Sequence, residues 1–442
     1  MADARGAMLR LSALVGERTL FENDAYRKLW LGRLLSHTPV NAVLYTMLIL
    51  VVEATGRSFA SSLFVAAYIA PTAALGTVSG VLADRMPKAI VLAGTNALRA
   101  ALCVLLAMST GSVWTIYLIA VLFATCSQFS GPAEASALPS VVEREDLTAA
   151  NSLSNLGGLL SQLAGFVLLP AVFLNTVGAG ALAIVCAAMF LAAAVNFLAI
   201  EGLGGAGVAM PASLAETRER FAEAWDRLAA DSVAYVAVVI TVLANTAGLV
   251  LVTLMPRYST EVLEIRTENV VFVAAPAALG IWLALRFVRR LSGRVSPRWS
   301  VGGSFALLVT AILLLAFVRP IGRALEDANV FGLFDPGPFG QSTARIMVTM
   351  VIGAGLAFAF TFVNVVGRSI VNERMPREMQ GRIFAAQHVL TNLASIPPVL
   401  LAGALADLMT VPPVYVAVAV VSAISALYFA ARNAAAPVRA VY

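Results

Sequence analysis

Charged residues are scarce in this chain of 442 residues: Asp, Glu, Lys and Arg together make up 12% of it. A soluble domain carries about 25% charged residues. Here 60% of the residues are hydrophobic, and the mean hydropathy is +0.86. Such a chain lacks the polar surface that would cover a folded domain in water. The composition therefore excludes an ordinary soluble protein and predicts an integral membrane protein.

Residues that carry bond-making chemistry are also few. The three cysteines fall inside apolar runs without paired spacing, which indicates neither a metal site nor a disulfide framework. His37 and His388 are the only histidines, and the chain has no H-E-x-x-H, G-x-S-x-G or Walker-type motif. These absences argue against a membrane enzyme and against an ATP-driven pump, and they predict no cofactor and no metal.

Twelve long apolar runs follow one another along the chain. They cover approximately residues 29–52, 59–82, 89–109, 113–135, 149–172, 177–200, 232–255, 267–290, 301–318, 344–367, 383–408 and 412–431. A spanning helix needs about 20 apolar residues, whereas barrel strands alternate over about ten. The predicted fold class is therefore all-α integral membrane, with twelve transmembrane helices crossing the lipid bilayer.

A polar stretch separates the sixth and seventh runs. Its first part is rich in Gly and Pro, and Leu214–Ala229 has apolar residues at helical spacing, which predicts an amphipathic helix on the membrane surface. The chain thus divides into a six-helix bundle (1–200), a linker containing this helix (201–231) and a second six-helix bundle (232–442). Weakly matching loop motifs, Gly80–Arg85 and Gly293–Arg298, indicate that the two bundles are pseudo-symmetric halves.

The basic residues predict the orientation of the chain. If the N-terminus is cytoplasmic, only six of the thirty basic residues fall outside. These six are Arg57, Arg257, Arg266, Arg319, Arg323 and Arg345. By the positive-inside rule both termini face the cytoplasm.

One loop motif resembles a known family. The stretch Gly80–Lys88 reads G-V-L-A-D-R-M-P-K, and it resembles motif A of the major facilitator superfamily, with Pro87 where glycine is usual. Further stretches, at residues 26–33, 131–139, 150–153 and 381–384, resemble that superfamily's enterobactin-exporter and macrolide-efflux branch. The resemblance implies a secondary transporter that works by alternating access.

In the resembled family the acid of motif A docks on the start of span eleven and locks the outward-open state, together with an acid of span four. The resemblance implies a gate formed by Gly80, Asp84, Arg85, Lys88 and Glu134. Arg85 or Arg99 is the expected partner of Glu134, because an acid so close to the bilayer is costly when unpaired. The alternative is that Asp84 and its basic neighbours are loop charges that only determine topology.

Polar residues inside the spans are candidates for the substrate cavity. They are Arg33, His37, Asn41, Tyr45, Gln128, Asn245, Thr361 and Asn364. Spans one, four, seven and ten, which carry them, line the cavity in the resembled fold. Each residue has an alternative: the amides and hydroxyls can bond neighbouring helices for about 0.6–2 kcal/mol. Arg33 either holds an anionic head group or extends to the membrane surface, and His37 either titrates or is packed.

A mostly apolar cavity suits an amphipathic or hydrophobic solute such as a drug, a siderophore-like molecule or a lipid. Proton-driven export is the expected function. However, no carboxylate lies in the middle of a span, and Val40 and Asn41 stand where many exporters of this branch have an acid. The coupling ion and the direction are therefore left open, and an uptake symporter or facilitator is the alternative. A non-transporting receptor or a membrane enzyme is less favoured. We expect a monomer in the bacterial inner membrane, without a nucleic-acid partner.

Overall fold

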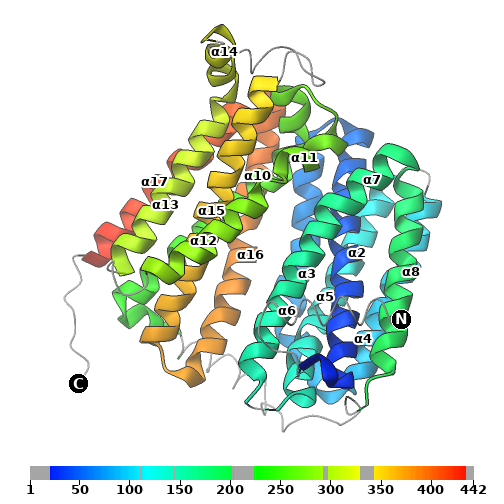
Figure 1. The fold of residues 1–442 in the computed structure, drawn as a ribbon. Coiled ribbons are helices and arrows are strands. Elements are labelled where there is room, and N and C mark those ends of the chain that lie inside the picture. Colours follow the sequence, from blue (N-terminus) through cyan, green and yellow to red (C-terminus); the bar gives the residue numbers. More distant parts are fainter. Residues whose placement is uncertain are drawn as a thin grey trace. The chain divides into compact units, whose positions relative to one another are not determined.

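The computed structural model describes residues 20–109, 112–143, 145–201, 203, 223, 225–291, 297–328 and 343–434. Helices dominate these residues, and no strand occurs among them (Figure 1). Each of the twelve predicted spans coincides with one helix or with a short series of helices. The prediction of an all-α membrane fold is confirmed.

The helices of the N-terminal half begin with a short turn and continue to residue 198. They are η1 (Leu20–Glu22), α2 (Asp24–Thr55), α3 (Ser58–Arg85), α4 (Lys88–Met108), α5 (Val113–Val141), α6 (Leu147–Gln162), η2 (Leu163–Leu168), α7 (Leu169–Thr176) and α8 (Ala179–Leu198). Residues 147–176 form one span, because the π-helical η2 joins α6 to α7 without a break. A π-helical turn of this kind shifts the hydrogen-bond register and often marks a functional region.

The helices of the C-terminal half begin at residue 232. They are α10 (Ser232–Tyr258), η3 (Ser259–Leu263), η4 (Thr267–Asn269), α11 (Val270–Ala274), α12 (Ala277–Leu291), α13 (Pro297–Ala316), α14 (Val318–Ala328), α15 (Thr343–Arg374), α16 (Arg377–Leu408) and α17 (Val411–Ala434). Hydropathy did not predict α14, which bends away from α13 by 69°. Its charged and apolar residues alternate at helical spacing, and this polarity lowered the hydropathy on which the spans were predicted.

Two compact units make up the chain. One comprises Met1–Leu50 and Ala70–Met210, and the other comprises Val51–Ile69 and Pro211–Tyr442. The hairpin Val51–Ile69, which ends α2 and begins α3, thus belongs with the C-terminal helices. Nothing in the sequence analysis anticipated this, because hydropathy does not report which helices pack together.

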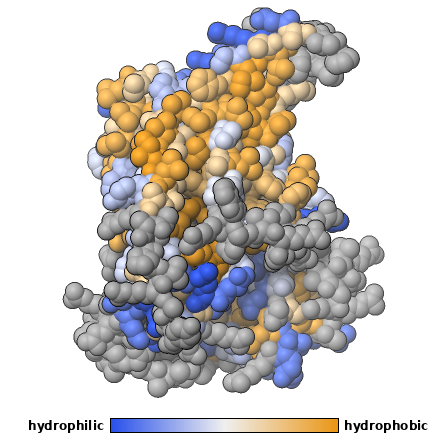
Figure 2. Space-filling view, turned by 90° about the vertical axis from the view of Figure 1, so that its left-hand side faces the viewer, coloured by the Kyte–Doolittle hydropathy of each residue, from blue (hydrophilic) through white to orange (hydrophobic). Residues whose placement is uncertain are grey.

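One face of the second unit is largely apolar. Figure 2 shows mostly hydrophobic residues on the side of α13 and α17. Its exposed side chains include Leu307, Leu314, Val421, Ile424 and Leu427, the last of them 70% exposed. An apolar face of this extent is unfavourable in water but is expected where helices contact lipid. It agrees with a chain that crosses the membrane several times.

The described end of the predicted amphipathic helix is helical from Trp225 to Ala230. Leu228 is buried, and the Trp225 ring packs edge-on against Tyr235 of α10 with 6.1 Å between centroids. Asp231 then caps α10, because its carboxylate accepts hydrogen bonds from the backbone N–H groups of Val233 and Ala234. Residues 214–222, the first part of the prediction, lie outside the described residues.

Candidate functional site

Glu134 is a buried acid of the first unit, with a side chain only 6% exposed. Its Oε2 lies 2.8 Å from Nε2 of His37 and 3.4 Å from Nε of Arg33. Arg33 and His37 are one turn apart on α2, so they present their side chains to α5 from one helix face. Arg33 and His37 are thus the residues in direct contact with this carboxylate, whereas Arg99, one of the two expected partners, acts on it only through its charge. The expectation that Arg99 forms the direct ion pair is wrong. The side chain of Arg85, the other expected partner, lies outside the described part of the structure.

Arg99 instead bonds to hydroxyl groups. Its side chain, on α4, donates to Ser127 at 2.9 Å, to Ser130 at 3.1 Å and to Ser36 at 3.4 Å, and the residue is 3% exposed. Ser36 precedes His37, and Ser130 lies one helical turn before Glu134. Arg99 thus holds α2 and α5 in the register that lets their charged residues meet. The sequence analysis missed these serines, although an arginine in mid-span has to find polar partners.

The cluster formed by Arg33, His37, Arg99 and Glu134 has one carboxylate for two guanidinium groups. Both arginines act electrostatically on Glu134. His37 is 46% exposed, while its partner carboxylate is nearly inaccessible. An imidazole and a carboxylate in hydrogen-bond contact can exchange a proton. The arrangement is therefore suited to moving a proton between an exposed group and a buried one.

The other candidates on the N-terminal unit do not join the cluster. Asn41 lies at the contact of α2 with η2, close to Gly165. Tyr45 packs edge-on against Phe166, with 6.4 Å between ring centroids. Gln128 Nε2 donates to Thr72 Oγ1 at 2.9 Å. Of the predicted face of α2, His37 is the residue that the structure places beside a buried charge.

The candidates of the C-terminal unit bond to one another. Nδ2 of Asn245 donates to Oδ1 of Asn364 at 3.0 Å, which joins α10 to α15. Each amide also donates to a carbonyl of its own helix. This is the interhelical bonding that the sequence analysis named as an alternative to substrate binding. Thr361, three residues before Asn364, is half-buried.

The predicted gate motif lies at the end of α3 and the start of α4. Lys88 donates through Nζ to the carbonyl of Ser136 at 2.9 Å and to Oγ of Ser140 at 2.7 Å, so α4 is tied to the end of α5. Gly80, Asp84 and Arg85 are helical, but the side chains of Asp84 and Arg85 lie outside the described part of the structure. The gate therefore stays a prediction.

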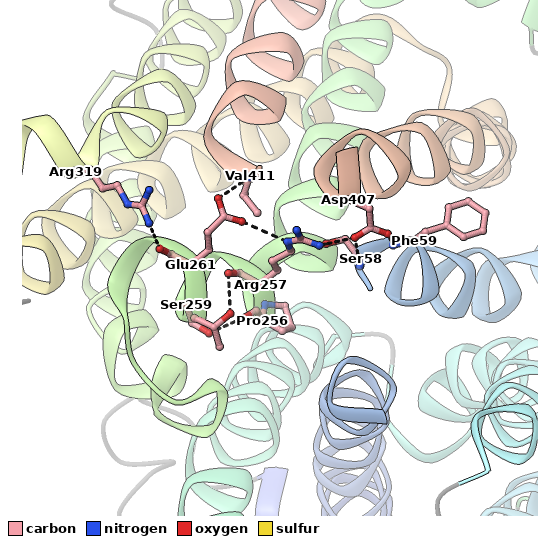
Figure 3. A network of polar contacts seen from close by, with 10 residues as sticks. Ser58, Phe59, Pro256, Arg257, Ser259, Glu261, Arg319, Asp407 and Val411 are labelled. Atoms are coloured by element: carbon pink, nitrogen blue, oxygen red, sulfur yellow. Dashed lines mark hydrogen bonds and ion pairs between the residues drawn. The ribbon is translucent and has the colours of Figure 1, made fainter. Parts of the chain in front are cut away.

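A second polar network lies in the C-terminal unit (Figure 3). The carboxylate of Asp407, at the end of α16, accepts hydrogen bonds from the backbone N–H of Ser58 at 2.7 Å and of Phe59 at 3.0 Å. It also pairs with Arg257 of α10. Arg57 directly precedes α3, and its side chain has no acceptor atom that could cap the helix. Asp407 takes this role from a distant part of the chain.

Glu261 extends the network toward α17. It accepts a hydrogen bond from Nε of Arg257 at 3.3 Å and one from the backbone N–H of Val411 at 3.2 Å, while its carbonyl accepts one from Arg319. Beside these residues is a cavity of about 310 Å³. It is lined by Val52, Gly56, Arg57, Ser58, Ser61, Thr253, Arg257, Thr260 and Glu261. In neither network do three or more His, Cys, Asp or Glu gather to hold a metal, as far as the structure describes the chain.

Replacing Asp407 by alanine is expected to lower the free energy of unfolding by about 1–2 kcal/mol, the range for loss of a helix cap. Asp407→Asn keeps one acceptor oxygen and should lose less. Thermal unfolding in detergent would measure both, with Asp226→Ala as the control because Asp226 is an exposed helical acid of the same unit. Equal stability of Asp407→Ala and the unsubstituted protein would contradict the capping role.

Comparisons with known proteins agree with this architecture. The family model of the Major Facilitator Superfamily matches residues 29–396. The solved structure of a mutant of the nucleoside transporter NupG superposes with a TM-score of 0.70 at 13% identity, over 92% of this chain and 99% of that one. No curated protein matches the sequence.

Two further structures are similar at 14% identity with TM-scores of 0.65. One is a bacterial homolog of the human lysosomal transporter Spinster, covering 93% of this chain and 97% of its own. The other, from work on proton dependent oligopeptide transporters, covers 93% and 98%. At these identities the structures show the fold alone, and the narrower exporter branch stays a prediction. Since the family model covers most of the sequence, the chain belongs to the Major Facilitator Superfamily and is a multi-pass membrane transporter, not an enzyme.

Proposed function

We propose that this transporter couples the movement of an amphipathic or hydrophobic small molecule to protons, with His37 and Glu134 as the proton-carrying pair. The observation that carries the proposal is the 2.8 Å contact between His37 Nε2 and Glu134 Oε2, which joins an exposed imidazole to a buried carboxylate. The sequence alone suggested no mid-span acid for this task. Glu134, nearer the end of α5, takes that role in the proposal, together with His37 of α2.

The salt bridge to Arg33 supports the proposal. A proton on Glu134 removes the charge that holds Arg33, so the guanidinium is released whenever the pair is loaded. A change of this kind at one helix contact is a local event that can bias a two-state transporter. Proton loading would therefore change the contact between α2 and α5.

The direction of transport depends on whether the bound proton weakens or strengthens the binding of the solute. Export by antiport, which the sequence resemblance favours, requires that the proton and the solute exclude each other. Uptake by symport requires that each favours the binding of the other. The excess of guanidinium groups over carboxylates in the cluster is the observation that favours symport for an anionic solute.

Reconstituted vesicles test the proposal. With an imposed pH gradient, the unsubstituted protein should accumulate an amphipathic solute such as a lysolipid, whereas Glu134→Gln should not exceed empty vesicles. Downhill movement should persist in that variant, because only the coupling is lost. The matched control is Glu373→Gln, since Glu373 is exposed and bonds only to Ser369 among the described residues. Gradient-driven accumulation by Glu134→Gln at the unsubstituted level would refute proton coupling through this pair.

A further inference from the structure

A narrow groove lies between α2 and α6 in the N-terminal unit. It is lined by Trp30, Arg33, Leu34, His37, Ser154, Gly157, Gly158 and Ser161. The groove is partly open to the surface, and its volume of about 20 Å³ admits a single water-sized group. One oxygen of a polar head group can enter a groove of this size, while the rest of the ligand stays outside it.

The groove is rich in unused hydrogen-bond donors. Arg33 contacts Glu134 through Nε, and neither of its terminal nitrogens has a partner among the described residues. Oγ of Ser161 is buried, with the residue 1% exposed, and it has no hydrogen-bond partner there. Nδ1 of His37 is likewise unused and becomes a donor when the ring is protonated. Of these three groups only Ser161 is buried, so it alone bears the cost of about 1–3 kcal/mol for an unsatisfied buried polar group. The side chains of Arg33 and His37 are 28% and 46% exposed, so a ligand can reach them.

The excess of positive charge in the cluster also favours a ligand with hydrogen-bond acceptors. Arg33 and Arg99 are always protonated, and Glu134 is the one acid with which they share the cluster. Protonated His37 would add a further positive charge. The acceptor that best satisfies a bidentate guanidinium and a hydroxyl is a carboxylate or a phosphate.

The walls of the groove are formed by rigid contacts. The Trp30 ring donates through Nε1 to the carbonyl of Leu153 at 2.9 Å. Gly157 lets this ring approach, since a Cβ there would lie 3.0 Å from Nε1. A Cβ on Gly158 would meet no atom within 4 Å. The space directly beside Gly158 is therefore open to a Cβ atom, and a larger side chain there would extend into the groove.

We propose that this groove binds the anionic head group, a carboxylate or a phosphate, of the transported amphipathic solute. The inference rests on the proposed function and specifies its substrate class. Proton and anion favour each other here, because a proton on Glu134 frees Arg33 for the anion. The solute and the proton would thus cross together, which selects symport over antiport.

Binding measurements on the full chain in a non-ionic detergent test the proposal. The probes are decanoate, decyl phosphate, decyltrimethylammonium and inorganic phosphate. At least one of the two anionic amphipaths should bind more tightly than the cation of equal tail length. Arg33→Gln should weaken this binding about tenfold to a hundredfold, as expected for loss of a charge-assisted hydrogen bond. Arg323→Gln, at an exposed arginine of α14 outside the groove, is the matched control.

Two further variants distinguish a failure of the groove proposal from a failure of the proposed proton coupling. Gly158→Leu should block binding by filling the groove, whereas Gly94→Leu, also in open space, should not. Glu134→Gln, which mimics the protonated acid, should bind the anion more tightly while losing proton-driven transport. Equal binding of anionic and cationic probes, unchanged affinity in Arg33→Gln and Gly158→Leu, or inorganic phosphate binding as tightly as decyl phosphate would overturn the inference. Anion binding without any pH-driven transport would instead refute the proposed function alone.

Discussion

Replacing Glu134 by leucine is expected to lower the free energy of unfolding by about 3 kcal/mol, the largest loss of stability among single changes in the cluster. The substitution leaves Arg33 and Arg99 without their nearby negative charge, and Arg99 is only 3% exposed. Removing one partner of a buried charged group costs more than the pair contributes, because the remaining charge stays desolvated. Unfolding in mixed micelles, followed by circular dichroism, measures the loss.

A double variant gives the control for this prediction. Arg99→Met combined with Glu134→Leu removes the uncompensated buried charge together with the acid, so stability should return toward that of the unsubstituted protein. Proton-coupled transport should stay lost, because the proton-carrying acid is absent. If Glu134→Leu alone unfolded like the unsubstituted protein, the carboxylate would not be the counter-charge of the two arginines.

Replacing Gly165 by alanine is expected to cost about 1–3 kcal/mol through overpacking. A Cβ at this position would lie 2.4 Å from the backbone oxygen of Thr38 and 2.6 Å from Cβ of Asn41. A backbone oxygen cannot rotate away as a flexible side chain can, so α2 and η2 have to separate. Small residues allow such close helix contacts inside a membrane.

The separation should also reduce transport, since Thr38 and Asn41 lie in the turn of α2 that directly follows His37. Gly94→Ala is the matched control, because its Cβ would meet nothing within 4 Å and alanine favours the helix by about 1 kcal/mol. Thermal unfolding and vesicle transport on both variants measure the effect. A Gly165→Ala protein as stable and active as the control would show that α2 and η2 do not need this close approach.

Some site residues could be proposed from the sequence because polar groups are rare in apolar spans. His37 and Glu134 stood out for that reason, and both lie in the cluster. Asn245 and Asn364 stood out equally, yet they bond to each other between α10 and α15. Hydropathy and spacing do not distinguish these cases, because the difference lies in which partner a residue meets on another helix.

Other residues gave no signal at all. Ser36, Ser127 and Ser130 are ordinary small residues in the sequence, and they matter only because Arg99 of a third helix points at them. Ser161 also gave no signal in the sequence. It matters because the structure leaves its buried hydroxyl without a hydrogen-bond partner at the wall of the groove. The capping of α3 by Asp407 joins residues 349 positions apart, so no local pattern in the sequence indicates it.

The sequence by itself determined that the chain is a bundle of membrane helices, because each long apolar run must satisfy its backbone hydrogen bonds within itself in lipid. This is a local requirement, and it can be read from consecutive residues. Only the tertiary structure decided that Glu134 meets His37 and Arg33, that the hairpin Val51–Ile69 joins the C-terminal unit, and that α6 leaves a groove beside α2. Those outcomes depend on helix rotation and packing between residues far apart in the chain, which no local pattern encodes.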